Sequence, residues 1–435
     1  MLRAVTVAGL ACLGVCLQAA APRPPSASFP PVSVERLSNG VAIVSQPAAH
    51  SQLIGAQVFL QTGLMQQPPD KAGIAAIAAS LVMRTPVEGG QTLDQIATRL
   101  GASVSYTLDP TATRFYIEAR PDDFPRLLHD LRDALRHPSL AAFAQQQAKT
   151  SSDTADLSKS PLEAAYAMVR RVRYAGTAFA LPDSGSALSL ANISSADVQQ
   201  YVLAAQHAGG TVVALAGSIT SDALDATKRE FSDFSMAAAS TVPPVHNEQR
   251  TRQIVAHRDV ASPWIAVAYP APNQYSADFA SMLVIEALLG QGGDVHALAF
   301  GSNSATPTDF LGAFYQYEAD PGSLIVFLDG SSSNVDQAVR DLKTGVTRLR
   351  DHTLPAGLVD EAKHLALGNY YLSTGNLNQL SWLLGRAYLS PEGVQFENTL
   401  PQRIARVSAA QIRRIAQRYL AQETVAIVLP TTDSH

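Results

Sequence analysis

The chain has 435 residues, of which 46% are hydrophobic and 16% are charged, and its formal net charge is −5. A chain of this length exceeds what one hydrophobic core normally holds, so we expect two or more domains. The slightly acidic balance and the lack of long basic runs argue against a nucleic-acid partner.

The first 21 residues have the pattern of an export signal. Arg3 supplies the positive end, residues 4–17 form an apolar stretch, and small residues at 19–21 fit a cleavage site. That stretch is too short to span a membrane, and no later apolar run is long enough. A mitochondrial presequence is the alternative, but such segments are Arg-rich and amphipathic. We therefore expect an exported protein, periplasmic or secreted, without a membrane span once the signal is removed.

The two cysteines, Cys12 and Cys16, both lie in this segment. Removal of the signal would leave a mature chain without cysteine. We therefore expect no disulfide and no thiol nucleophile.

The first half of the mature chain alternates strands and helices after a Pro/Ser/Ala-rich linker at residues 22–31. Alternating apolar patterns predict strands, and helical periodicity and capping residues predict helices. The expected strands cover residues 41–44, 53–60, 103–108, 114–119 and 211–217. The expected helices cover residues 73–84, 93–100, 122–136 and 140–173, with a further helix capped near Ser194 and ending near Ala208.

The second half repeats this order. Its expected strands cover residues 253–256, 264–269, 311–317, 324–328 and 423–429, and its expected helices cover residues 277–289, 334–350 and 355–384. Residues 407–412 parallel residues 193–198, and residues 423–429 parallel residues 210–216, which indicates an internal duplication. We predict an α+β fold of two halves, each a mainly antiparallel sheet with helices packed on it. The predicted division is signal 1–21, linker 22–31, first domain 32–225, linker 226–250 and second domain 251–431.

The segment before the first long helix resembles a known family. A strand leads to a second strand that ends Gln61-Thr62-Gly63, and Gly73-Ile74-Ala75 opens the helix. This order resembles the entry to the zinc helix of the pitrilysin/insulinase family, which includes the mitochondrial processing peptidases. The resemblance covers essentially the whole mature chain and implies the duplicated architecture of that family.

In active members of that family the helix continues with His-x-x-Glu-His, in which the histidines bind zinc and the Glu activates water. The resemblance places Ala76, Ala79 and Ser80 at these positions. Alanine has no donor atom for a metal, and a serine hydroxyl is a poor zinc ligand. Asp153 and Asp156 are the acidic residues nearest to the family's third ligand, a Glu. The resemblance thus implies the fold without the chemistry, and we expect zinc only in a partner subunit.

The second half carries further likenesses to the family. Residues 288–293 correspond to its Gly-rich turn, which we interpret as a helix end rather than a phosphate loop because no Lys-Ser/Thr follows. Residues 300–309 correspond to a substrate-gripping segment but contain no Arg. Residues 290–303 and 314–324 are most similar to the second core protein of mitochondrial ubiquinol–cytochrome c reductase, a member without peptidase residues.

No other catalytic pattern is present in the sequence. The ten histidines form no i, i+4 pair, and there is no Gly-x-Ser-x-Gly elbow. The strongest charge clusters, residues 170–173 and Arg413-Arg414, are typical of solvated helix faces.

We therefore expect a non-catalytic member that acts beside an active zinc peptidase of the same family, or as a homo-oligomer, and that helps to hold peptides. The alternative is a structural core subunit of a respiratory complex, which a true presequence would favour. A peptidase that binds zinc elsewhere is disfavoured because the sequence has no histidine pair.

Overall fold

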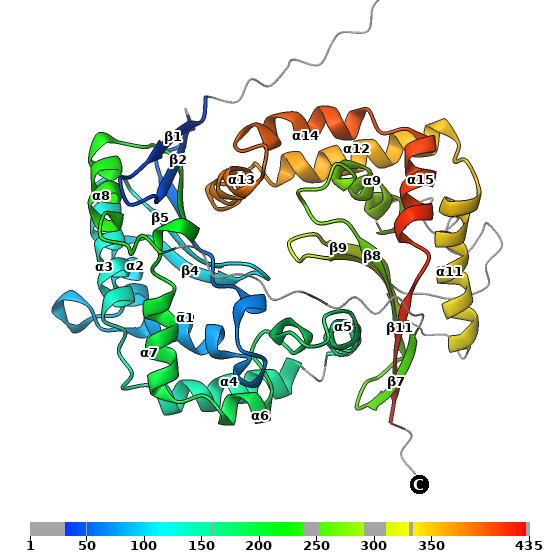
Figure 1. The fold of residues 1–435 in the computed structure, drawn as a ribbon, viewed down its shortest axis with the longest axis horizontal. Coiled ribbons are helices and arrows are strands. Elements are labelled where there is room, and N and C mark those ends of the chain that lie inside the picture. Colours follow the sequence, from blue (N-terminus) through cyan, green and yellow to red (C-terminus); the bar gives the residue numbers. More distant parts are fainter. Residues whose placement is uncertain are drawn as a thin grey trace, which may run out of the picture.

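The computed structural model describes residues 31–48, 50–157, 160–237, 245, 252–290, 310–329 and 334–431. The predicted export signal and the segment at residues 300–309 lie outside these residues, as do nearly all of the first linker and residues 291–293 of the Gly-rich turn. The described chain forms two halves, each built on one β-sheet (Figure 1).

The sheet of the first half has six strands in the order β1-β2-β6-β3-β5-β4. All neighbouring strands are antiparallel except β2 and β6, which are parallel. The strands are β1 (Ser33–Arg36), β2 (Ala42–Pro47), β3 (Ile54–Leu60), β4 (Ser103–Leu108), β5 (Thr113–Ala119) and β6 (Thr211–Gly217). The predicted strands of this half are therefore confirmed, with β1 added at the edge.

The helices of the first half begin where the sequence offers caps. Thr92 and Ser194 each accept a hydrogen bond from the backbone three residues on, which starts α2 and α7 as predicted. The helices are α1 (Ile74–Arg84), α2 (Leu93–Leu100), α3 (Phe124–Arg136), α4 (Phe143–Leu157), α5 (Pro161–Arg173), α6 (Ala187–Ala191), α7 (Ser195–Ala204) and α8 (Ser221–Phe231).

The second half repeats the topology of the first. Its sheet has the order β7-β11-β8-β10-β9, with β7 and β11 parallel and the other neighbours antiparallel. The strands are β7 (Arg252–Arg258), β8 (Trp264–Ala271), β9 (Phe310–Gln316), β10 (Gly322–Asp329) and β11 (Thr424–Pro430). Each takes the place of one strand of the first sheet, in the order β2, β3, β4, β5 and β6, so the predicted duplication is confirmed.

The helices of the second half follow the same plan. They are α9 (Phe279–Gly290), α11 (Val335–Asp351), α12 (Ala356–Leu372), α13 (Leu377–Leu389), α14 (Gln395–Ala405) and α15 (Ala409–Tyr419). Helix α9 follows the second strand of its half as α1 does, and α15 is capped by Ser408 as α7 is by Ser194. No helix among the described residues is both long and apolar enough to cross a membrane.

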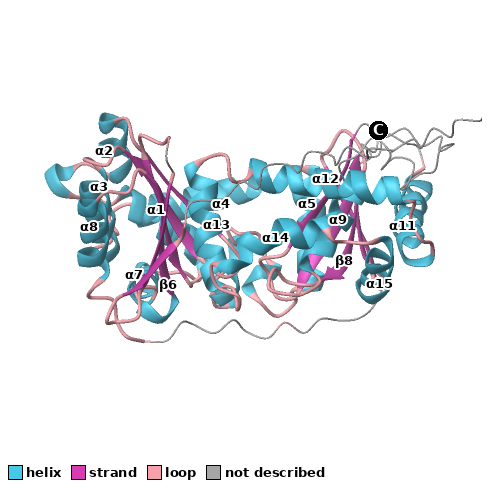
Figure 2. Cartoon of the chain, turned by 90° about the horizontal axis from the view of Figure 1, so that it is seen from above, coloured by secondary structure: helices cyan, strands magenta, loops and turns pink. Residues whose placement is uncertain are grey.

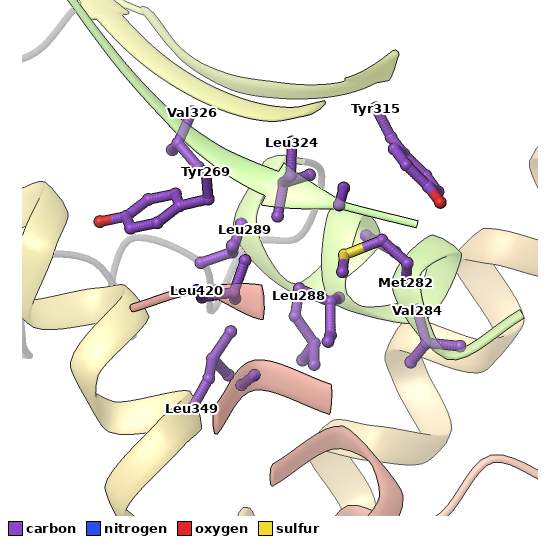
Figure 3. Close-up of a cluster of buried hydrophobic side chains, with 14 of the residues drawn as sticks. Tyr269, Met282, Val284, Leu288, Leu289, Tyr315, Leu324, Val326, Leu349 and Leu420 are labelled. Carbon is purple, nitrogen blue, oxygen red and sulfur yellow. The ribbon is translucent and has the colours of Figure 1, made fainter. Parts of the chain in front are cut away.

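Each half has its own apolar core between one face of its sheet and its helices. In the second half, α9 is almost entirely apolar apart from Ser281 and Glu286, and it lies between the sheet and the outer helices (Figure 3). Met282 and Leu288 of α9 pack there with Leu324 of β10 and Leu349 of α11, all almost fully buried. A helix surrounded in this way needs apolar side chains on nearly every side.

The other face of each sheet is covered by a helix from the opposite half. Helix α5 of the first half packs on β8 and β11, and α13 of the second half packs on β3 and β6 (Figure 1). Seen from above, the two sheets lie towards opposite ends of the molecule, with α4, α5 and α13 between them (Figure 2). The halves therefore exchange helices, and neither sheet is covered on both faces without the other half.

Two expected long helices are each split in the structure. The predicted helix at residues 140–173 is two helices, because Pro161 cannot occupy a helix interior and instead opens α5 behind the cap Ser160. The predicted helix at residues 355–384 ends at Leu372, and Asn376 caps a new helix, α13. These breaks allow α5 and α13 to leave their own halves.

Helix α8 was not predicted from the sequence. It runs from Ser221 to Phe231 and packs on α3 of the first half. The expected boundary between residues 225 and 226 falls within this helix, so the first structural unit extends at least to Phe231. The helix capped by Ser194 ends at Ala204, earlier than the predicted end near Ala208.

Candidate functional site

The sequence placed the candidate site on α1, and a glycine fixes how this helix begins. Gly73 has a φ of 97°, a left-handed conformation that other residues rarely adopt. A Cβ at this position would lie 2.6 Å from the backbone oxygen of Ser184. Helix α1 therefore enters the core against a neighbouring loop, with α4 and α7 packed along it.

The three residues at the family's zinc positions lie on one stretch of this helix. Ala76 is partly exposed, whereas Ala79 and Ser80 are buried, with exposed fractions of 2% and 8%. Ala79 lines an internal cavity of about 20 Å³ together with Thr62 and Tyr201. A space of this size holds about one water molecule.

The surroundings of Ser80 are polar but contain no metal-ligand set. Ser80 lies near the Tyr106 hydroxyl. Burial raises the pKa of Tyr106, and the nearby Ser80 hydroxyl and the charge of Lys149 partly oppose this rise. Lys149 of α4 is itself paired with Asp153, with Nζ and Oδ2 2.6 Å apart.

The described side chains of helix α4, which packs on α1, supply no substitute for the third ligand. Asp153 is exposed and engaged with Lys149, and the side chain of Asp156 lies outside the described part of the structure. Thr150 is buried at 3% exposure and lies near Gln146, whose Nε2 donates to its hydroxyl at 3.3 Å. Neutral amides and hydroxyls do not form a zinc site.

The residues present at these positions therefore do not fit zinc. At the three positions that the resemblance assigns to the zinc site the chain has two alanines and one serine, and none of these side chains is a good zinc ligand. Among the described residues, no cluster of three or more His, Cys, Asp or Glu side chains could hold a metal ion. No chemical step can be assigned to this location.

The arginine cluster at residues 170–173 is not a solvated helix face as predicted. Arg170 and Arg173 of α5 are buried, with exposed fractions of 4% and 5%. Arg170 donates to Asp183 at 2.6 Å and to two backbone oxygens, whereas Arg173 Nε donates to Ser323 Oγ at 2.8 Å. Ser323 belongs to β10 of the other half, so the exchange of α5 buries Arg173 between the halves, whereas Arg171 is exposed.

A second polar location, which the sequence analysis did not identify, lies where the two halves meet. Arg386 of α13 is buried and donates from Nε to Glu397 of α14 at 3.0 Å. Glu318 feels the charges of Arg386 and of the Asp109–Arg114 pair from the first half. Burial, and next the charge of Asp109, raise the pKa of Glu318 to about 7. The acidic residues of this location are far apart in the sequence, so no sequence pattern indicated that they lie together.

The family models match both halves. The model described as "Insulinase (Peptidase family M16)" matches residues 41–182, which include α1. The model described as "Peptidase M16 inactive domain" matches residues 192–365. The chain belongs to the insulinase family. The resemblance stated from the sequence is thereby confirmed, and no curated protein sequence matches this family member.

Solved structures with the same fold share little sequence with this insulinase-family chain. A protease from Helicobacter pylori has a TM-score of 0.83 at 16% identity, with 92% of this chain and all of that chain covered. A peptidase M16 inactive domain protein from Pseudomonas fluorescens has a TM-score of 0.77 at 14% identity, with 92% and 98% covered. A chain of complex III from Candida albicans has a TM-score of 0.78 at 12% identity, with 92% and 96% covered. At these identities the likeness establishes the two-half fold.

Proposed function

We propose that this protein is a non-catalytic member of the insulinase family that acts as the partner of an active zinc peptidase. The observation that carries the proposal is the replacement of all three family residues on α1 by Ala76, Ala79 and Ser80 within an otherwise complete fold. In this role the chain shapes and stabilises a peptide-holding chamber, and the partner supplies the zinc. A homo-oligomer is the alternative assembly.

The exchange of α5 and α13 supports this role. A subunit that forms one wall of a chamber must keep a fixed shape, and each half here is completed by a helix of the other. Residues buried in that exchange, such as Arg173 and Ser323, join the halves by direct hydrogen bonds. The proposal includes export to the periplasm or outside the cell, which rests on the pattern of residues 1–21.

The test compares the mature chain alone with the same chain co-expressed with a His-x-x-Glu-His member of the family from the same source. We expect the isolated chain to contain no stoichiometric zinc and to cleave no peptide. The two chains should elute together in size-exclusion chromatography, and the pair should hold zinc and cleave peptides faster than the partner alone. Zinc and cleavage in the isolated chain would overturn the proposal.

A designed variant tests the assignment of positions on α1. Ala76→His with Ser80→His places two imidazoles one helical turn apart, the spacing that zinc requires. This variant should gain zinc binding in a dialysis measurement. The control is Asp360→His on α12, which creates an exposed i, i+4 pair with the native His364. It measures the zinc that any histidine pair on a helix surface would bind. No difference between the two variants would show that residues 76 and 80 do not face a zinc position.

The second candidate is a core subunit of a respiratory complex. It is supported by the shared fold and by the sequence likeness of residues 290–303 and 314–324. It makes a different prediction in the same purification. The chain would then co-purify with haem-containing membrane subunits rather than with a soluble zinc peptidase.

A further inference from the structure

The second half contains a cavity of about 220 Å³ between α9, α12, α13 and α14. These helices adjoin one another in the second half (Figure 1). Helix α9 takes the place of α1 and packs on α12 as α1 packs on α4. The cavity is therefore the second half's counterpart of the α1–α4 region, and no histidine is among the described residues that line it.

One wall of this cavity carries a carboxyl group without a charged partner. Glu286 of α9 accepts a hydrogen bond at Oε1 from the backbone N–H of Tyr315 at 3.0 Å. None of the ion pairs of the described residues includes Glu286, and its burial raises its pKa to about 7. A buried carboxylate normally has a cationic partner, because an unpaired buried charge is costly.

The other walls are aromatic. Phe279, Tyr317 and Trp382 line the cavity with Leu283 and Leu383. Rings of this kind attract a cation over their faces, and they exclude water from the carboxylate. Apolar side chains would accommodate the alkyl part of a ligand.

The arginine that lines the cavity is already neutralised. Arg386 pairs with Glu397, with Nε and Oε1 3.0 Å apart, and the Arg386 guanidinium stacks over Trp382 at 4.5 Å. The largest charge effects on Arg386 come from Glu397, Tyr317 and Glu318, and no ion pair of the described residues joins Arg386 to Glu286. Arg386 is therefore not the cationic partner of Glu286.

We propose that this cavity binds an alkylammonium group, with the cation on Glu286 and the alkyl chain among Phe279, Leu283 and Trp382. The group comes either from a small primary amine or from a lysine side chain of a peptide. Binding gives the carboxylate of Glu286 a cationic partner and places the alkyl chain of the ligand against apolar side chains. The site stands independently of whether the chain partners an active peptidase.

Isothermal titration of the whole mature chain with pentylamine, with 1-pentanol as the uncharged probe, tests the proposal. We expect pentylamine to bind and pentanol to bind at least tenfold more weakly. A pKa of about 7 makes Glu286 about 90% ionised at pH 8 and about 10% at pH 6, so pentylamine affinity should fall about tenfold between these values. The other titratable groups that line the cavity, Tyr317, Tyr370 and Arg386, keep their charge over this range.

Two variants make the test specific. Glu286→Gln should reduce pentylamine affinity at pH 8 at least tenfold, whereas Glu361→Gln removes an equal charge from the exposed face of α12 and should leave affinity unchanged. Ala366→Leu, which fills the cavity from α12, should reduce binding of both probes. Unchanged binding in Glu286→Gln, with a native melting profile, would overturn the proposal.

A lysine-containing tripeptide with blocked ends, compared with its norleucine counterpart, distinguishes the two sources. Binding of the lysine peptide as well as pentylamine assigns the cavity to a peptide side chain. Binding of pentylamine alone assigns it to a free small amine. Failure of both amine probes would show that the cavity does not take an alkylammonium group.

Discussion

The substitution Gly385→Ala tests whether the exchanged helix α13 is seated on the first sheet as tightly as the structure shows. A Cβ at residue 385 would lie 2.1 Å from Cε2 and 2.5 Å from Cζ of Phe59 on β3. Ordinary van der Waals contact needs about 3.4 Å or more, so the ring must move by over an ångström. Phe59 is only 3% exposed and has no open space to move into.

The expected effect on stability follows from two opposing contributions. Replacing Gly by Ala within a helix stabilises by about 1 kcal/mol, and overpacking a filled core costs about 1–3 kcal/mol. The displacement here is large, so the net result should be a loss of about 1–2 kcal/mol. Gly368→Ala, on the exposed face of α12 with no atom near its added Cβ, should instead gain about 1 kcal/mol.

Urea unfolding of both variants and of the wild-type chain measures this difference. The double variant Gly385→Ala with Phe59→Leu should lose less than the sum of the single changes, by about 1 kcal/mol, because the smaller side chain makes room for the added methyl group. If Gly385→Ala is as stable as Gly368→Ala, α13 is not packed on β3 as described. The two halves would then not be held as one rigid unit by α13.

Three further predictions concern buried ionisable groups. Arg386→Met should cost about 3–5 kcal/mol in urea unfolding because it leaves the carboxylate of Glu397 buried without its partner; a loss below about 1 kcal/mol would contradict the pairing. Because the pKa of Glu318 is raised in the folded state, its contribution to the free energy of unfolding is fully present below about pH 4.5 and is lost as the pH rises to about 7. Glu318→Gln should therefore flatten the decline in melting temperature between pH 5 and 8. His207 is buried, and neither ring nitrogen has a hydrogen-bond partner among the described groups, so burial lowers its pKa. Buried His207 should therefore lower the stability of the folded state as the pH falls below 6.5. His207→Leu should reduce the fall in melting temperature between pH 7 and 5. An unchanged dependence of melting temperature on pH over this range would contradict the prediction.

The order of strands and helices was predictable because each element carries a local signal. Thr92 before α2 and Gly101 after it mark both ends of that helix, and the structure has the capping box and the left-handed glycine that these residues favour. The duplicated cap and strand at the end of each half likewise predicted the repeat. Such signals depend on neighbours along the chain.

The exchange of α5 and α13 was not predictable in this way. Pro161 and Asn376 mark the start of each helix, but no local pattern says which sheet a helix will cover. Arg173 illustrates the consequence, since its charge suggested solvent and its partner Ser323 lies in the other half. The cavity lined by Glu286 was missed for the same reason, because its walls come from four helices.

The loss of the zinc residues is compatible with the fold because those residues contribute chemistry rather than packing. Alanine has the highest helix propensity, so Ala76 favours α1 more than a histidine would, and the buried Ala79 favours it more than a metal-free glutamate would. Ser80 lies near the Tyr106 hydroxyl, in surroundings that suit a neutral polar side chain. A chain with Ala76, Ala79 and Ser80 at these positions can therefore keep, and even strengthen, helix α1. The fold does not depend on the residues that carry the family's chemistry, and the proposed partner role needs only the fold.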